Sequence, residues 1–101
     1  MDAARDALAA PEFLLFKHSY RCGISTRAQK AYEAFLAESD VPSGWIDVVD
    51  DRPISLWVAE ETGVTHASPQ VIYLRNGEVV WHESQFAITK EALEAATSPT
   101  P

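Results

Sequence analysis

The stretch FLLFKHSYRCGISTRAQ, residues 13–29, decides how the rest of the chain is interpreted. It opens with FLLFK (13–17), a continuous apolar run of strand length, typical of a strand that is covered on both faces. A short turn follows and carries Cys22, the only cysteine in the chain. From Gly23 the apolar residues follow a helical spacing. This order predicts a cysteine at the start of a helix, directly after a buried strand.

Positive charge surrounds this cysteine, although the chain as a whole is acidic. The chain carries 8 basic residues against 15 acids, yet residues 13–32 contain no acid. Half of the basic residues lie in that segment, namely Lys17, Arg21, Arg27 and Lys30. Basic neighbours and the free N–H groups of a helix start both lower the pKa of a thiol below its ordinary value of about 8.5. We therefore expect a reactive thiolate at Cys22, stabilised by Arg21, Gly23 and Ser25.

The other elements follow from periodicity and turn signals. Helices are expected over residues 2–10, from Gly23 to before Asp40, over 53–62 with Asp51 as cap and Gly63 as end, and over 90–96 with Thr89 as cap. Strands are expected over 13–17 and 45–50, and in a hairpin over 70–84 around Asn76–Gly77.

The predicted order α-β-α-β-α-β-β-α belongs to the α/β class and is the thioredoxin-like arrangement. It implies a central mixed four-stranded sheet flanked by helices, in a single domain over residues 1–97, with 98–101 as a frayed tail. A ligand site belongs at the carboxyl ends of the parallel strands, where Cys22 lies. This architecture also predicts a cis-proline before the third strand, at Pro69, with the backbone of Ser68 facing a bound partner.

The spacing around the cysteine indicates which thiol chemistry is available. Cys22-Gly23-Ile24-Ser25 is a C-x-x-C pattern with serine in the second place. A dithiol enzyme resolves its mixed disulfide with that second cysteine, whereas this chain needs a thiol from outside. The pattern favours an enzyme that takes a small thiol off a protein and passes it to a free thiol.

Composition excludes several other functions. A net charge of −7 argues against nucleic acid or an anionic membrane as partner. No apolar run is long enough to span a bilayer, and the charged N-terminus does not match a signal peptide. A single cysteine cannot form an internal disulfide. We therefore expect a cytoplasmic monomer.

The sequence also predicts roles for the histidines, the tryptophans and three acids. The spacings of His18, His66 and His82 match no zinc pattern, so no metal is expected, and His18 and His66 are predicted to line the thiol pocket and bind substrate. The three tryptophans are expected to pack in the core and between helices and sheet. Asp47, Asp50 and Asp51 are expected to form a solvated strand end and a helix cap.

The segments FKHSYRCGIS, DRPIS and VTHASPQVIYLRNGEVVWHES, with the closing AIT, resemble the monothiol bacilliredoxin family, also called YtxJ-like proteins. The resemblance runs nearly end to end. It implies a cytoplasmic thioredoxin fold that acts on S-thiolated proteins, with bacillithiol as co-substrate and no bound cofactor. Cys22 matches the family's active-site cysteine, and Ser68-Pro69-Gln70 matches its cis-proline segment. The chain departs from the family at Gly23, where proline is usual, and at Gln85, where histidine is usual.

Two alternatives stay open. RCGIS is also similar to the CGFS signature of monothiol glutaredoxins, which with glutathione can hold a [2Fe–2S] cluster, although ESQFAIT lacks their glycine-rich acidic turn. A thioredoxin-like scaffold can also serve as a binding module without turnover. A brown colour after anaerobic purification would favour the glutaredoxin-like protein. A Cys22→Ala substitution that leaves thiol-exchange activity unchanged would favour the binding module.

Overall fold

The fold was analysed in a computed structural model that describes residues 2–18, 23–84 and 87–97 of the 101-residue chain. The helices are α1 (Asp2–Ala9), α2 (Gly23–Leu36), α3 (Arg52–Thr62) and α4 (Lys90–Thr97). The strands are β1 (Glu12–His18), β2 (Ser43–Asp47), β3 (Gln70–Arg75) and β4 (Glu78–Ser84). The element order is the predicted one. The tail proposed over 98–101 lies outside the described residues.

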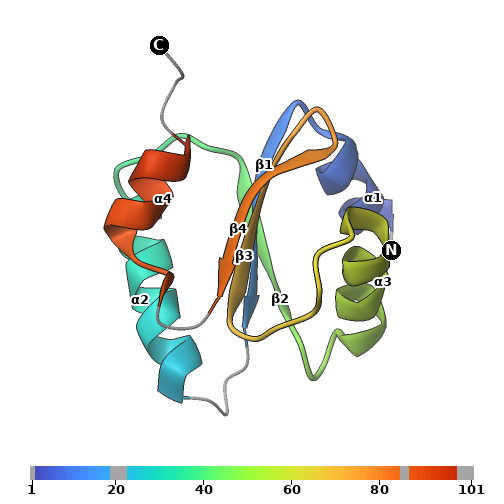
Figure 1. Ribbon diagram of the computed structural model, residues 1–101, viewed down its shortest axis with the longest axis horizontal. Helices are drawn as coiled ribbons and strands as arrows, with labels where there is room; N and C mark the ends of the chain where they lie inside the picture. The colour runs from blue at the N-terminus through green and yellow to red at the C-terminus, as the bar shows by residue number, and fades with distance from the viewer. Residues whose placement is uncertain (1, 19–22, 85–86, 98–101) are drawn as a thin grey trace.

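The four strands form one mixed sheet with the order β2-β1-β3-β4. β1 pairs with β2 in parallel and with β3 antiparallel, and β3 pairs with β4 antiparallel. β1 is therefore a central strand, which explains its continuous apolar run. Figure 1 shows the sheet between two helical layers, with α2 and α4 on one face and α1 and α3 on the other.

Each helical layer buries its own core against the sheet. On the α2–α4 face, β1 contributes Leu14 and Phe16 to a cluster that includes Phe35 and Leu93. On the α3 face the alternate residues of the strands, such as Leu15, pack into a second cluster with Val58 of α3. Because successive strand residues point to opposite faces, odd-numbered positions of β1 face α3 and even-numbered positions face α2. This alternation determines the face of the sheet on which each site residue of β1 lies.

The second strand differs from its predicted range 45–50. β2 begins at Ser43 and ends at Asp47. It ends there because the Asp47 carboxylate accepts hydrogen bonds from the backbone N–H groups of Val49 and Asp50, at 2.8 and 2.9 Å, which turns the chain. Asp47 is only 5% exposed, so the expected solvated strand end is wrong at this residue.

The cap of α3 also differs in detail from the prediction. Asp51 occupies the N-cap position but makes no side-chain cap hydrogen bond. Its carboxylate instead accepts the N–H of Asp47 at 3.1 Å, which ties the start of α3 to the end of β2. At the other end Gly63 adopts a left-handed conformation with φ of 73° and closes the helix as predicted.

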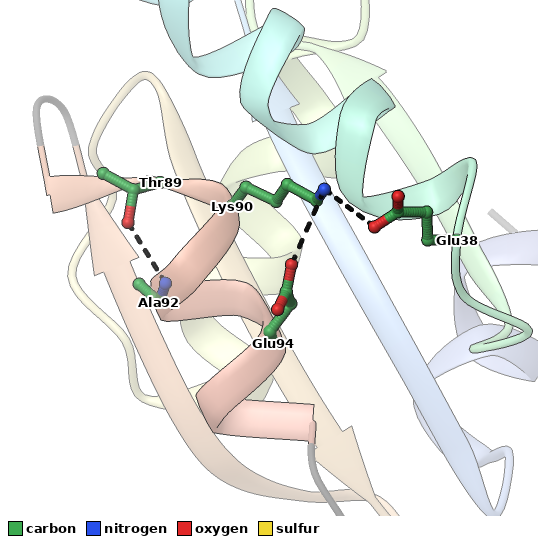
Figure 2. Close-up of polar contacts among 5 residues, drawn as sticks. All are labelled: Glu38, Thr89, Lys90, Ala92 and Glu94. Atoms are coloured by element: carbon green, nitrogen blue, oxygen red, sulfur yellow. Dashed lines mark hydrogen bonds and ion pairs between the residues drawn. The ribbon is translucent and has the colours of Figure 1, made fainter.

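The hairpin and the last helix confirm the local signals. Asn76 and Gly77 both have positive φ, as a two-residue turn between antiparallel strands requires. Figure 2 shows the start of α4, where the Thr89 hydroxyl accepts the N–H of Ala92 at 3.1 Å. In the same view Lys90 reaches Glu38, after α2, at 2.7 Å. The Thr89 contact caps α4, and the Lys90–Glu38 ion pair links α4 to the segment after α2.

Among the described residues no helix is long and apolar enough to cross a membrane.

Candidate functional site

The predicted nucleophile lies between two described elements. Arg21 and Cys22 fall outside the described residues, so the structure does not place their side chains. Gly23, the residue after the cysteine, is the first residue of α2, and Ser25 lies in its first turn. The side chains of this turn are also outside the described part of the chain. The backbone therefore agrees with a cysteine that directly precedes a helix.

Several element ends meet at one edge of the sheet. β1 and β2 are parallel, and their last residues, His18 and Asp47, are register partners. In the antiparallel pair β1–β3, Lys17 lies opposite Gln70, the first residue of β3. Figure 1 shows the end of β1 and the starts of α2, α3 and β3 at the same end of the molecule. This is the predicted position for a ligand site at the carboxyl ends of parallel strands.

The loop before β3 contains the predicted docking segment. The peptide bond between Ser68 and Pro69 is cis, and Pro69 is buried. The next residue, Gln70, is also buried, and its side-chain amide donates to the carbonyl of Thr65 at 2.9 Å. This bond fixes the loop against the first residue of β3. The hydroxyl of Ser68 is buried and has no hydrogen-bond partner among the described residues.

Lys17 is the most unusual residue of this region. Its side chain is 0% exposed, and its ammonium has no hydrogen-bond partner within the described part of the chain. Burial lowers the pKa of Lys17 from 10.5 to about 8, because a charged amine loses its hydration there. The ammonium is therefore still charged at neutral pH. The apolar run FLLFK predicted a buried strand, but it did not predict a buried charge within that strand.

His66 lies on the α3 side of the sheet. Its ring is exposed, and Nδ1 is 3.2 Å from the hydroxyl of Ser55, a fully buried residue of α3. The pKa of His66 is lowered from 6.5, first by partial burial and then by the positive charges of Lys17 and Arg52. The ring is therefore neutral at neutral pH, and it can exchange a hydrogen bond with a substrate without adding charge.

His18 lies on the other face of the sheet. It is 3% exposed and stacks on Phe16 with ring centroids 5.4 Å apart. Trp45 of β2 lies 4.6 Å from the His18 ring, and Tyr32 of α2 stacks on Phe16. The sequence predicted that His18 and His66 both line one pocket. The sheet separates them, because His18 occupies an even-numbered position of β1 and His66 approaches from the α3 side.

A shallow groove accompanies the aromatic residues around His18. It has a volume of about 260 Å³, and its lining residues include His18, Tyr32, Glu33 and Trp45. Trp45 is 53% exposed, so the expectation that it packs in the core is wrong. Trp57 and Trp81 do pack against the two cores, as expected. A larger hollow of about 370 Å³ lies near α1 and the hairpin turn, at the opposite end of the sheet from the site.

The described residues contain no group of three histidine, cysteine or acidic side chains that could hold a metal ion. Cys22 lies outside the described residues. Sequence reasoning assigned no contact to the side chains of Ser55 and Gln70, whose polar groups shape the loop around His66 and Pro69. Only the fold shows these contacts, because they join residues that lie apart in the chain.

The comparison with protein families gives a match over most of the chain. The model of the family described as monothiol bacilliredoxin BrxC matches residues 2–93, which is most of the chain.

Solved structures give the same architecture. One described, provisionally, as an oxidoreductase with a thioredoxin fold superposes with a TM-score of 0.91 at 31% identity, covering 97% of this chain and 88% of the other. A mutant thioredoxin from Halobacterium salinarum gives a TM-score of 0.77 at 17% identity, covering 100% of this chain and 88% of the other. Thioredoxin from Trypanosoma brucei brucei gives 0.78 at 14% identity, covering 95% and 80%. The last two matches show the fold alone, and that fold is the predicted one.

Proposed function

Since the chain belongs to the monothiol bacilliredoxin family of thiol oxidoreductases, we propose that it removes a low-molecular-weight thiol, bacillithiol, from S-thiolated proteins. The nucleophile is Cys22, and the intermediate is a mixed disulfide between Cys22 and the small thiol. The partners are S-thiolated proteins and the free small thiol. The protein acts in the cytoplasm as a monomer and needs no bound cofactor.

The reaction has two exchange steps. In the first, the Cys22 thiolate attacks the small-thiol sulfur of the substrate disulfide, and the substrate protein leaves as a thiolate. In the second, an external small-thiol thiolate attacks that same sulfur in the mixed disulfide. This step releases a symmetrical small-thiol disulfide and regenerates the Cys22 thiolate. The external step is needed because the chain has no second cysteine.

One observation carries the proposal. The chain's only cysteine is the residue before Gly23, with which α2 begins, and α2 begins at the end of the molecule where β1 ends and the Ser68–Pro69 loop leads into β3. A helix start favours a thiolate, because its free N–H groups and dipole favour negative charge. The neighbouring loop supports a role for the Ser68 backbone in substrate docking, and His66 belongs to the same loop, three residues before Pro69.

Intact-mass spectrometry tests the function. The protein is incubated separately with oxidised bacillithiol, oxidised glutathione and cystine, and each adduct is then treated with the matching free thiol. We expect one bacillithiol adduct at Cys22, its removal by free bacillithiol, and no adduct on Cys22→Ser. Recovery of a bacillithiol-capped test protein should then require both Cys22 and free bacillithiol.

Other outcomes would change the assignment. A stable adduct formed only with glutathione would move the chain toward glutaredoxin-like chemistry. Visible absorbance after anaerobic purification with glutathione would indicate a [2Fe–2S] carrier. Absence of any adduct on the folded, reduced protein would leave a binding module and would refute the enzymatic proposal.

A further inference from the structure

The shallow groove on the α2 face of the sheet has no part in the exchange chemistry described above. β1 contributes Phe16 and His18 to its lining, β2 contributes Trp45, and one face of α2 completes it. Its volume is about 260 Å³. Pockets that enclose a whole small molecule usually measure about 300–1,000 Å³. The groove is therefore of a size for a single side chain of a partner protein.

Trp45 presents an aromatic surface to this groove. It is 53% exposed, and its ring lies 4.6 Å from the ring of His18, tilted by 58°. The hydroxyl of Tyr32 on α2 donates to the carbonyl of Gly44, the residue before Trp45, at 2.9 Å. These contacts hold the Trp45 ring and the two sides of the groove in a fixed arrangement. An exposed aromatic ring held in this way can bind a cation on its face.

Glu33 supplies a negative charge on the α2 side of the groove. Its carboxylate accepts a hydrogen bond from Nε2 of Gln29 at 3.1 Å, and both residues line the groove. Within the described part of the chain no basic side chain forms an ion pair with Glu33. Lys30, one turn earlier on α2, is exposed and does not line the groove. The groove thus combines an aromatic face with a carboxylate that no cation neutralises.

This combination selects the chemistry of the occupant. Glu33 repels an acidic side chain, and an apolar side chain would remove water from the carboxylate without replacing its hydrogen bonds. A guanidinium meets both requirements, because its planar fork of N–H groups donates to a carboxylate while its flat face stacks on an aromatic ring. A lysine ammonium supplies the charge but lacks the flat face. Arginine is therefore the side chain that fits best.

The substrates of the proposed reaction carry such side chains near the reacting sulfur. Cysteines that become S-thiolated are reactive ones, and reactive cysteines commonly lie beside lysine or arginine, which lower their pKa. α2 begins at Gly23, and Gln29 lies six residues later, about 9 Å along the helix axis. A substrate protein bound at the start of α2 is therefore within reach of the groove with a neighbouring basic side chain.

We propose that this groove binds an arginine side chain of the S-thiolated partner protein, with the guanidinium paired to Glu33 and stacked on Trp45. This inference rests on the proposed function, since that function supplies the partner. Glu33 and Trp45 take no part in the exchange of sulfur–sulfur bonds. They determine which protein substrates bind well.

The first test measures binding without any thiol. A short cysteine-free peptide with one arginine is titrated into the wild-type protein at low salt, and the indole N–H signal of Trp45, assigned with Trp45→Phe, is followed by NMR. The same peptide with citrulline is the neutral control. We expect a saturable shift with the arginine peptide and binding at least about threefold weaker with citrulline.

Two matched variants separate the groove from the general charge of this acidic chain. Glu33→Gln should weaken binding of the arginine peptide by about threefold, the size expected for an exposed ion pair. Glu60→Gln makes the same change at an exposed acid of α3, on the other face of the sheet, and should leave binding unchanged.

The second test measures the choice between protein substrates. One S-thiolated test protein has arginine beside its capped cysteine, and a matched version has glutamine there. We expect wild type to show about a threefold lower KM for the arginine version. Glu33→Gln and Trp45→Leu should each reduce this preference, whereas Trp45→Phe and Glu60→Gln should retain it. Comparing variants on both substrates cancels any direct effect of the arginine on the capped sulfur.

Equal binding of the arginine and citrulline peptides to wild type would overturn this inference. An equal loss in Glu33→Gln and Glu60→Gln would also overturn it, since that result would indicate a general charge effect. A wild-type dimer in solution that Trp45→Leu converts to a monomer would do the same, because a second copy would then cover the groove. The proposed function fails separately, if wild-type Cys22 forms no adduct. The peptide titration needs no thiol, so it tests the groove in that case too.

Discussion

Nδ1 of His66 and the hydroxyl of Ser55 lie 3.2 Å apart, and this contact joins the loop before β3 to the first turn of α3. Ser55 is fully buried, whereas the His66 ring is exposed at the site edge. The bond therefore orients an accessible ring from a fixed point in the core. With Nδ1 engaged by Ser55, Nε2 is the ring nitrogen that can contact a substrate.

Ser55→Ala should remove this orientation without a large change of volume. We expect the free energy of unfolding to fall by about 1 kcal/mol, the ordinary value for a lost hydrogen bond at a partly buried site. We also expect a higher KM for an S-thiolated protein with little change in kcat, since the His66 ring becomes less ordered. Urea unfolding and steady-state kinetics measure the two effects. His82→Ala, which removes an exposed histidine of β4, is the control. An equal KM change in both variants would contradict a role for His66.

The titration of His66 should report the charge of Lys17. The pKa of His66 is lowered from 6.5 by burial and by the positive charges of Lys17 and Arg52. Lys17→Met should therefore raise this pKa, and NMR titration of the ring protons measures it. Since the folded pKa is lowered, the associated stability is fully present above about pH 6.5 and is lost as the pH falls through the folded value. No change in the variant would show that the two groups do not interact.

Stability should rise above about pH 8 and reach a maximum at about pH 10. The folded pKa of Lys17 is about 8 against 10.5 unfolded, so the unfolded chain binds more protons between these values and stability rises with pH. Burial raises the pKa of Tyr32 from 10.0 to about 12, so the folded chain holds more protons above pH 10 and stability falls again. Urea unfolding across this range measures the curve.

Two variants test which group causes the rise and which causes the fall of stability with pH. Lys17→Met should abolish most of the rise above pH 8, because the buried ammonium is gone. Tyr32→Phe should weaken the fall above pH 10, at the cost of the Tyr32 hydroxyl bonds to the carbonyls of Leu14 and Gly44. If the stability of Lys17→Met rises by the same amount above about pH 8, a group other than Lys17 causes the rise.

The start of α4 offers a test of stability that is independent of the site. Thr89→Ala removes the hydroxyl that accepts the N–H of Ala92, and we expect a loss of about 1 kcal/mol in the free energy of unfolding. Lys90→Ala removes the ion pairs with Glu38 and Glu94, which involve exposed carboxylates, and it should cost less than about 1 kcal/mol. Thermal or urea unfolding compares them. A larger effect from Lys90 would mean that its contact with Glu38 anchors α4 to α2.

Local signals predicted the elements because each depends on residues close together in the chain. The apolar run of β1, the Asn76–Gly77 turn and the left-handed Gly63 are all where the sequence predicted them. The end of β2 was missed because it depends on a carboxylate, that of Asp47, which binds backbone N–H groups instead of facing solvent. Whether an aspartate faces solvent or binds backbone N–H groups depends on its burial in the tertiary structure.

The sequence by itself determined the fold class, the single thiol and its place before α2, since these follow from periodicity, turn residues and cysteine count. Only the tertiary structure decided which side chains share a face of the sheet. It separated His18 from His66, exposed Trp45, and left the ammonium of Lys17 buried opposite Gln70. These outcomes depend on strand order and register, which bring together residues far apart in the chain, and no local pattern encodes such pairings.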